Sequence, residues 1–218
     1  MNEKNGSTQH SWSDTFYIEA EKGLHKNGNL EDAIWLQDIQ HRRIFITEEI
    51  DDSSIQQPCE WIMRYNLEDN GVPKEERKPI LLYIDTCGGA VDAGLKLIDT
   101  ILLSETEVRV ICAQRCYSMG FYIFLAGHKR YASKHASFLL HDGTTFTYDS
   151  ASKARDRMEF ERKLEDRIRD YVLERSNITG EEYDSNMRKE WYMFSDEAKE
   201  RGVVDFIIGE DCTIEEVC

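Results

Sequence analysis

Residues 79–89, Pro-Ile-Leu-Leu-Tyr-Ile-Asp-Thr-Cys-Gly-Gly, decide the fold class of this chain. The run from Pro79 to Asp85 is almost continuously apolar, which is typical of a strand buried on both faces of a sheet. Gly88-Gly89 then predicts a turn, and apolar residues at helical spacing follow from 90 to 103. A buried strand, a glycine turn and a helix together make half of a βα unit.

The same alternation continues in both directions from this unit. Short runs of β-branched and aromatic residues predict strands, and apolar residues at helical spacing predict helices between them. This order favours an α/β domain with parallel strand pairing. The longest helix, expected at 151–175, has one apolar side and a dense mix of charges on the other. The other expected elements are strands at 43–47, 107–113, 137–141 and 203–208 and helices at 54–66, 118–126 and 196–201.

The composition is that of a folded globular protein. The chain has 218 residues, 40% of them hydrophobic and 32% charged, which fits one large domain or one domain with an arm. The longest uncharged apolar run, 121–127, is too short to cross a bilayer, and residues 1–14 lack the basic and apolar segments of a signal peptide. We expect a cytoplasmic protein with a flexible arm at 1–30, a domain at 31–209 and a tail at 210–218.

The charge of the chain narrows the range of partners. Lys and Arg number 27 and Asp and Glu 42, so the net charge is −15 and the isoelectric point is near 4.8. Such a surface repels phosphate backbones and anionic lipids, which argues against nucleic-acid and membrane binding. The six cysteines form no Cys-x-x-Cys pair and have no histidine at zinc spacing, so we expect free thiols, no metal site and no cofactor.

Two segments carry groups suited to acyl chemistry. Gly88-Gly89 ends a buried strand, and residues without a Cβ leave backbone N–H groups open to a ligand, so that they can serve as an oxyanion hole. Ser118 follows a strand and begins an apolar helix, where unpaired N–H groups favour negative charge. Each segment also has an ordinary interpretation, a tight turn for the glycines and a helix N-cap for the serine.

A histidine and an acidic residue complete the candidate set. His141 ends the apolar strand that begins at Phe138, and histidine, with an ordinary pKa near 6.5, suits a general base at neutral pH. Glu190 precedes Trp191 and Tyr192, whose rings can desolvate a carboxylate that orients an imidazole. The alternatives are a hydrogen-bonded strand-end histidine and a charged surface residue.

These features are more informative together than alone. A nucleophile at a helix start, a base at a strand end, a carboxylate and a pair of backbone donors are the parts that acyl transfer requires. Acyl transfer through a serine nucleophile is therefore the chemistry that the sequence favours.

The order and spacing of these segments resemble the proteolytic subunit of the Clp protease, a cytoplasmic serine peptidase with a crotonase-like fold. The resemblance runs from about residue 32 to 209. The family has the motifs Arg-Ile-Ile-Phe, Asn-Ser-Pro-Gly-Gly, Ala-Ser-Met-Gly and Met-Ile-His-Gln-Pro, and near its end His-Thr-Gly, Glu-Ala and Gly-Leu-Ile-Asp. The matching segments are Arg43-Ile44-Phe45-Ile46, Asp85-Thr86-Cys87-Gly88-Gly89, Tyr117-Ser118-Met119-Gly120, Leu139-Leu140-His141-Asp142-Gly143, Asn177-Ile178-Thr179-Gly180, Glu197-Ala198 and Gly202-Val203-Val204-Asp205.

The resemblance implies a role for each candidate residue. Ser118 would be the nucleophile and His141 the general base. The N–H groups of Gly88 or Gly89, together with that of Met119, would form the oxyanion hole.

The chain also departs from the family in ways that mark it as a divergent member. Glu190 stands where the family has its catalytic aspartate, and the extra methylene changes the reach, so Asp184 is a substitute candidate. Cys87 replaces a proline, and Tyr117 replaces a small residue before the nucleophile, where it could crowd the pocket. Residues 144–148 are rich in β-formers where the family has a glycine-rich strand that binds extended substrate and joins rings.

The resemblance further implies an architecture and partners. The fold would contain repeated β-β-α units and a long protruding handle helix at about 150–176. As a homo-oligomer, the protein would form two heptameric rings around a chamber that cleaves unfolded polypeptides. A separate AAA+ ATPase would deliver the substrate, since the chain has no Gly-x-x-x-x-Gly-Lys-Ser/Thr motif of its own.

Two other functions are compatible with the sequence. The first is a catalytically silent subunit that shapes a mixed ring with an active relative, since Glu190 and Tyr117 depart from the family. The second is an acyl-CoA enzyme of the crotonase type, whose oxyanion hole stabilises an enolate. The pairing of Ser118 with His141 and the negative charge of the chain argue against this second alternative.

Overall fold

The computed structural model describes residues 17, 18, 20–23, 28–143 and 150–218. The chain divides into two compact units, Met1–Ile44 and Phe45–Cys218. Much of the arm expected at 1–30 lies outside the described residues, as does the β-rich segment at 144–148. The second unit carries all the candidate site residues.

The first unit contains a helix that the sequence pattern does not predict, α2 (Leu30–Gln40). Its start is fixed by a capping box, in which the Asn29 side chain accepts a hydrogen bond from the Asp32 N–H at 2.9 Å. The Asp32 carboxylate in turn accepts from the Asn29 N–H at 3.4 Å. Apolar residues occur on more than one side of α2, so helical periodicity does not reveal it.

The second unit is built on a sheet of seven strands among the described residues. The order is β1-β2-β3-β4-β7, and the long strand β3 pairs also with β5, which pairs with β6. The pairs β2–β3, β3–β4, β3–β5 and β4–β7 are parallel, and β5–β6 is antiparallel. The predicted α/β class with parallel pairing is therefore confirmed. The strands are β1 (Arg43–Ile46), β2 (Ile80–Thr86), β3 (Val108–Tyr117), β4 (Lys129–Ser133), β5 (Ser137–Leu140), β6 (Trp191–Phe194) and β7 (Phe206–Ile208).

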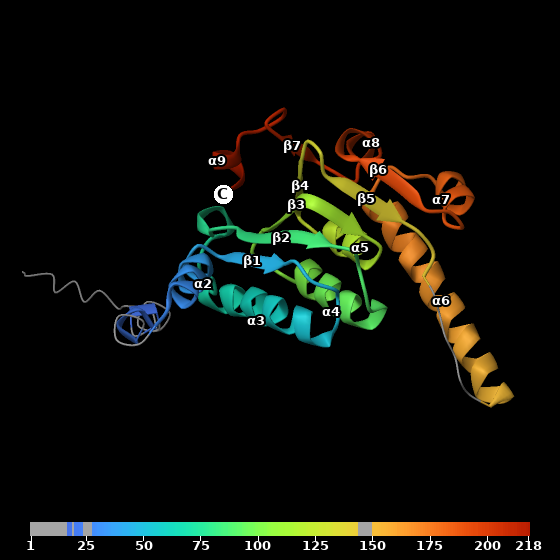
Figure 1. The fold of residues 1–218 in the computed structure, drawn as a ribbon, viewed down its shortest axis with the longest axis horizontal. Coiled ribbons are helices and arrows are strands. Elements are labelled where there is room, and N and C mark those ends of the chain that lie inside the picture. The colour runs from blue at the N-terminus through green and yellow to red at the C-terminus, as the bar shows by residue number, and fades with distance from the viewer. Residues whose placement is uncertain (1–16, 19, 24–27, 144–149) are drawn as a thin grey trace, which may run out of the picture. The chain divides into compact units, whose positions relative to one another are not determined.

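Three helices cover one face of this sheet (Figure 1). The helix α3 (Asp52–Glu68) packs against α4 (Val91–Leu102), and α4 packs against α5 (Met119–Leu125). Every side chain of α5 is buried, and the ring of Phe124 lies 4.9 Å from that of Phe138 on β5. The helix that follows Ser118 therefore belongs to the hydrophobic core.

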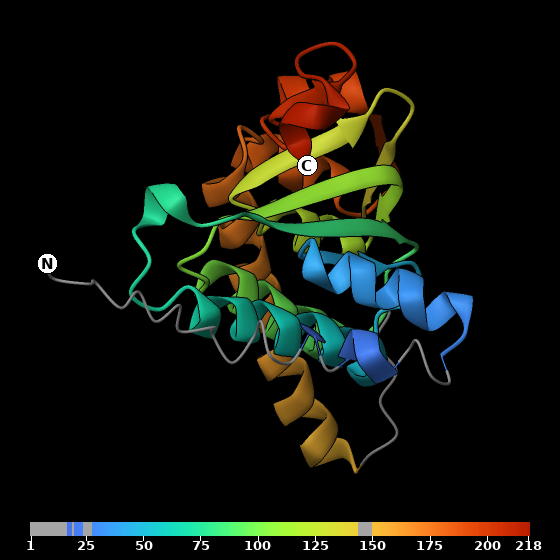
Figure 2. The same ribbon diagram turned by 90° about the vertical axis from the view of Figure 1, so that its left-hand side faces the viewer.

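The longest helix, α6 (Ala151–Arg175), projects beyond the sheet, as Figures 1 and 2 show. Val172 near its end is buried, whereas Met158 and Phe160 are 68% and 56% exposed. Arg175 holds this end in place, because its guanidinium donates to the carbonyl oxygens at the end of α5, Leu125 at 3.0 Å and Gly127 at 2.7 Å among them. The expected protruding helix is thus present and is anchored at one end.

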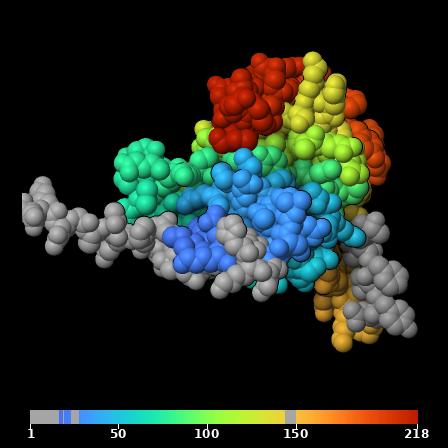
Figure 3. Space-filling model, turned by 60° about the vertical axis from the view of Figure 1, so that its left-hand side comes forward, coloured from blue at the N-terminus to red at the C-terminus, as the bar shows by residue number. Residues whose placement is uncertain are grey.

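The remaining elements are short, and several of them are not predicted from the sequence. Strands β4 and β6 are polar or only four residues long, and β3 continues through Tyr117 rather than ending at 113. In the last helix, Val217 packs against Leu81, Ile111 and Tyr131, and this end of the chain is the red surface in Figure 3. The remaining short helices are η1 (Lys74–Glu76), α7 (Gly180–Asn186), α8 (Ser195–Glu200) and α9 (Ile214–Val217).

Candidate active site

Ser118 occupies a sharp turn between a strand and a buried helix. It is the one residue between β3 and α5, and its backbone has φ 51° and ψ −120°. A positive φ is uncommon for a residue other than glycine and persists only where the surroundings enforce it. Here the Ser118 N–H donates to the carbonyl of Leu139 on β5 at 2.9 Å, and the Ser118 carbonyl accepts from the Phe121 N–H at 2.9 Å. The serine is therefore held at the apex of the turn.

The diglycine turn lies directly against this serine. Gly88 has φ +102°, and a Cβ added to it would lie 2.7 Å from Ser118 Cβ and 3.0 Å from the Met119 nitrogen. Gly89 has φ +151°, and a Cβ there would overlap the backbone of Ile50. Both positions therefore require glycine. Gly88 does so because of the Ser118 turn, and Gly89 because of the backbone segment at Ile50.

The hydrogen bonds of the turn distinguish the two glycine N–H groups. The Gly88 N–H donates to Thr86 Oγ1 at 3.1 Å, and the Gly88 carbonyl accepts from the Ile50 N–H at 2.8 Å. Within the described part of the chain, the Gly89 N–H and the Met119 N–H have no hydrogen-bond acceptor. Of the two glycines, Gly89 is thus the one with a donor available to a substrate oxygen.

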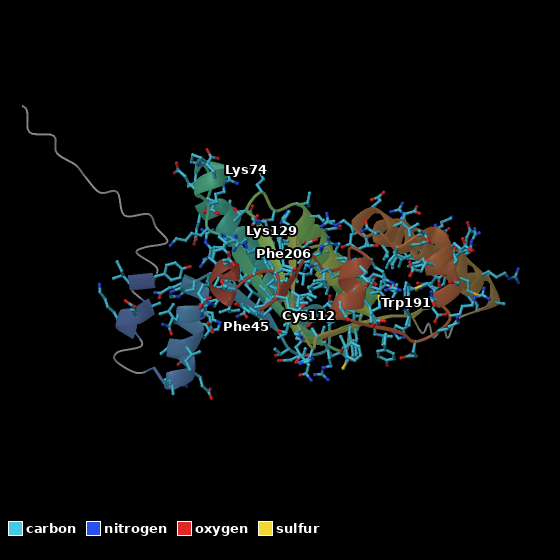
Figure 4. The ribbon with its side chains drawn as sticks, turned by 90° about the horizontal axis from the view of Figure 1, so that it is seen from above. Phe45, Lys74, Cys112, Lys129, Trp191 and Phe206 are labelled. Atoms are coloured by element: carbon cyan, nitrogen blue, oxygen red, sulfur yellow. The ribbon has the colours of Figure 1, made fainter. Side chains whose placement is uncertain are left out.

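His141 and Glu190 are brought together by the antiparallel pairing of β5 with β6. Leu140 pairs with Trp191, so one further step of the ladder sets His141 opposite Glu190. His141 Nδ1 lies 3.3 Å from Glu190 Oε1. The His141 side chain is 27% exposed and that of Glu190 is 60% exposed. In Figure 4, Trp191 marks this end of the sheet, toward α6 and away from Phe206.

Two tyrosines lie beside this pair. The Tyr192 hydroxyl donates to Glu190 Oε2 at 2.8 Å. The ring of Tyr192 meets the ring of Tyr117 edge-on, with centroids 5.7 Å apart and an interplanar angle of 80°. The Tyr117 hydroxyl lies 2.8 Å from Ser137 Oγ. Tyr117, the bulky residue before Ser118, therefore contacts residues of both β5 and β6.

The serine and the histidine occupy neighbouring strand ends but are not hydrogen-bonded to each other. Tyr117 on β3 pairs with Leu139 on β5, so Ser118 and His141 both lie just beyond the carboxyl ends of adjacent parallel strands. Among the described residues, the Ser118 hydroxyl makes no hydrogen bond with His141. Catalytic hydrogen bonds are often long or poorly aligned without substrate and tighten when substrate binds.

Asp184, the alternative acid, has another partner. It lies on α7, where Arg169 of α6 donates to its two carboxylate oxygens at 2.7 and 2.9 Å. This hydrogen bonding lowers the pKa of Asp184. Of the two candidate acids, Glu190 is the one that lies beside His141.

A hollow of about 280 Å³ lies on the β2 side of the diglycine turn. Arg115 lines it, with Nε donating to Asp85 Oδ1 at 2.9 Å and a terminal nitrogen 3.7 Å from Cys87 Sγ. Sequence reasoning did not identify Arg115, and the only signal was its place three residues before Ser118. The hollow is lined by Thr47, Glu48, Glu49, Asp85, Thr86, Cys87, Gly88, Gly89 and Arg115.

No helix in the described ranges combines the length and the apolar character needed to span a bilayer.

Comparison with known proteins identifies the family. A proteolytic subunit of the ATP-dependent Clp protease from Chara vulgaris is 31% identical over 191 residues, which cover 84% of each chain. A Marchantia polymorpha protein of the same name is 30% identical over 83% of this chain and 90% of its own. In Bacillus licheniformis, proteolytic subunit 2 of the ATP-dependent Clp protease is 28% identical over 78% of this chain and 87% of its own. The sequence model of the Clp protease family matches residues 26–211, and the chain therefore belongs to the Clp protease family.

Proposed function

We propose that this protein is a serine endopeptidase that cleaves unfolded polypeptides through an acyl-enzyme. Membership in the Clp protease family supports a peptidase function. The observation that carries the finer assignment is the convergence of three segments, with Ser118 against the diglycine turn and His141 paired with Glu190 on the next strand. These are the parts of a nucleophile, base and orienting acid arrangement.

In the proposed mechanism, His141 works through both ring nitrogens. Nδ1 faces Glu190 Oε1 at 3.3 Å, and with the proton held on Nδ1 the other nitrogen, Nε2, accepts the Ser118 proton. Ser118 Oγ attacks the peptide carbonyl carbon, and the imidazolium returns the proton to the leaving amine. Water then attacks the ester, and Ser118 is regenerated with release of the acid product.

The negative oxygen of the tetrahedral intermediate requires donors that are fixed before the reaction. The N–H groups of Gly89 and Met119 suit this role, because neither has an acceptor among the described residues. Gly88 contributes by letting the turn approach, since a Cβ there would lie 3.0 Å from the Met119 nitrogen. Removal of one such donor typically costs a factor of about 100–1,000 in kcat.

The proposal includes the assembly expected of the family. The exposed apolar residues Met158 and Phe160 on the projecting part of α6 support contact with other copies in two heptameric rings. Because the sequence has no nucleotide-binding Gly-x-x-x-x-Gly-Lys-Ser/Thr motif, ATP hydrolysis is assigned to a separate AAA+ partner. The six cysteines are free, in keeping with a reducing cytoplasmic location.

A second candidate, a catalytically silent subunit of a mixed ring, is favoured by two observations. The Ser118 hydroxyl has no hydrogen bond to His141 within the described residues, and the Glu190 side chain is 60% exposed. A triad that is not assembled in any state of the particle would leave the serine unactivated.

Covalent labelling distinguishes the two candidates. The purified particle of native size is treated with a fluorophosphonate, and the intact mass is measured for the wild type, Ser118→Ala and Ser185→Ala. Ser185, an exposed serine on α7, is the matched control. We expect one adduct per chain in the wild type and in Ser185→Ala, and none in Ser118→Ala. An assembled wild-type particle that acquires no adduct, and cleaves no unfolded protein, would contradict the peptidase proposal and favour the silent subunit.

A further inference from the structure

The carboxylate that faces His141 is held at both of its oxygens. Glu190 Oε1 lies 3.3 Å from His141 Nδ1, and Glu190 Oε2 accepts from the Tyr192 hydroxyl at 2.8 Å. The Tyr192 contact is the shorter of the two. In this structure, therefore, the tyrosine holds the carboxylate more closely than the histidine does.

The sheet register places the Tyr192 side chain on the same face of the sheet as Glu190. In the β5–β6 ladder Tyr192 pairs with Leu139, two positions from the point at which Glu190 faces His141. Side chains two apart on a strand point to the same face, so Tyr192 and Glu190 project together. The hydroxyl reaches the carboxylate along one strand without any loop between them.

Tyr192 is itself supported by the body of the sheet. Its ring packs edge-on against Tyr117 at 5.7 Å, and the Tyr117 hydroxyl lies 2.8 Å from Ser137 Oγ. Edge-to-face contacts of this kind add stability beyond the buried area. The contacts therefore run from Ser137 on β5 to Tyr117 on β3, from Tyr117 to Tyr192 on the edge strand β6, and from Tyr192 to Glu190.

Glu190 needs such support because most of its side chain faces solvent. It is 60% exposed and has one more rotatable bond than aspartate, so an unrestrained carboxylate would sample several rotamers. A single 3.3 Å contact with a histidine is a weak restraint in water. The hydrogen bond from the Tyr192 hydroxyl favours the rotamer that faces His141.

We propose that Tyr192 is a positioning residue, which holds Glu190 against His141 and is braced by Tyr117. The two departures from the family pattern, glutamate for aspartate and tyrosine before the nucleophile, thereby act as one compensating unit. This inference rests on the proposed peptidase function for its kinetic consequences, but its geometry can be tested without activity. The groups that face the Tyr192 hydroxyl are Glu190, Tyr117 and Cys87, and the bond to Glu190 raises the pKa of Tyr192, so the hydroxyl remains a protonated donor.

The test is Tyr192→Phe, which removes the hydroxyl and keeps the ring. Tyr131→Phe, on β4 and stacked on Phe206, is the matched control. Loss of one hydrogen bond to a carboxylate predicts a fall in kcat of about 3- to 10-fold with KM unchanged. The control should retain the kcat of the wild type. Equal kcat for Tyr192→Phe and the wild type would overturn the proposal.

A second test repeats Tyr192→Phe in a Glu190→Asp protein, to show whether Tyr192 acts through Glu190. The shorter side chain draws the carboxylate away from the Tyr192 hydroxyl, so Tyr192→Phe should cost less than about 2-fold when it is added to Glu190→Asp. The same loss in both backgrounds would show that Tyr192 does not act through Glu190. Crystal structures of the wild type and Tyr192→Phe test the geometry alone: Glu190 should leave His141 in the variant. A wild type without activity would contradict the proposed function, whereas Glu190 unmoved in the variant would contradict this inference.

Discussion

Gly88→Ala tests whether the close contact between the diglycine turn and Ser118 sets the position of the nucleophile. Carbon atoms in contact lie about 3.5–4.0 Å apart, whereas the new methyl would lie 2.7 Å from Ser118 Cβ, an overlap of about 1 Å. It would also lie 2.8 Å from the Tyr117 carbonyl oxygen, so it cannot be relieved by a side-chain rotation. The turn itself must move by about 1 Å, a displacement that typically costs about 100-fold in rate.

The matched control is Gly71→Ala. Gly71 has φ +85°, but a Cβ there has no atom within 4 Å, so this variant carries the cost of a positive φ without a clash. We expect Gly71→Ala to lower the free energy of unfolding by about 1–2 kcal/mol and to leave peptidase activity intact. For Gly88→Ala the overlap adds about 1–3 kcal/mol to that loss.

The assays are chemical denaturation and kcat/KM for a fluorogenic peptide, both on particles of native size. If Gly88→Ala matched Gly71→Ala in stability and kept at least half of the wild-type activity, the contact would not position the nucleophile. A loss of stability without a loss of activity would show that the turn relaxes away from Ser118, which also contradicts the reasoning.

Two further predictions concern the acid of the site and the stability of the fold. Glu190→Gln should lower kcat/KM by about 100-fold or more, whereas Asp184→Asn, which only breaks the surface pair with Arg169, should leave it unchanged; the reverse ranking would assign the acid to Asp184. His128 Nδ1 accepts the Val108 N–H at 2.9 Å, and burial, with the nearby Arg175 charge, lowers the pKa of His128. Its stabilising contribution is therefore fully present above about pH 6.5, the unfolded value, and is lost as the pH falls through the lower folded pKa. Unfolding free energies measured from pH 8 to pH 5 should fall more steeply for the wild type than for His128→Asn. Parallel curves would refute the prediction that His128 contributes to this pH dependence.

Much of the fold follows from local sequence patterns. The apolar run of β2, the buried face of α4 and the amphipathic α6 each carry a clear period, and all three occur where the sequence predicts them. The strand β4, Lys-Arg-Tyr-Ala-Ser, carries no apolar pattern, because only Tyr131 and Ala132 are buried. Its formation depends on its parallel neighbours β3 and β7, which local periodicity cannot reveal.

The candidate site likewise contains some residues that sequence patterns identify and others whose place depends on tertiary packing. Ser118, His141 and the glycines are recognisable because each follows an apolar run that predicts a strand. Glu190 precedes a four-residue strand, β6, which the sequence does not predict, so its register with His141 emerges from tertiary pairing. The Tyr192 contact with Glu190 and the Arg169 contact with Asp184 depend on rotamers and on the packing of separate elements. Sequence spacing therefore leaves Asp184 and Glu190 open as alternatives, whereas the pairing of strands distinguishes them.

The burial of α5 and the edge position of β6 predict different rates of local opening at the two sides of the candidate site. Amides in a fully buried helix exchange with solvent water only through large, near-global openings, whereas those of an edge strand exchange through local fraying. Every side chain of α5 is buried, while β6 pairs on one side only among the described residues. The backbone of α5, next to Ser118, therefore opens only in near-global unfolding, whereas β6, which carries Tyr192, can also open by local fraying. Deuterium uptake should thus be slow at α5 and fast at β6, so that the proposed pair of His141 and Glu190 can open reversibly while Ser118 remains protected.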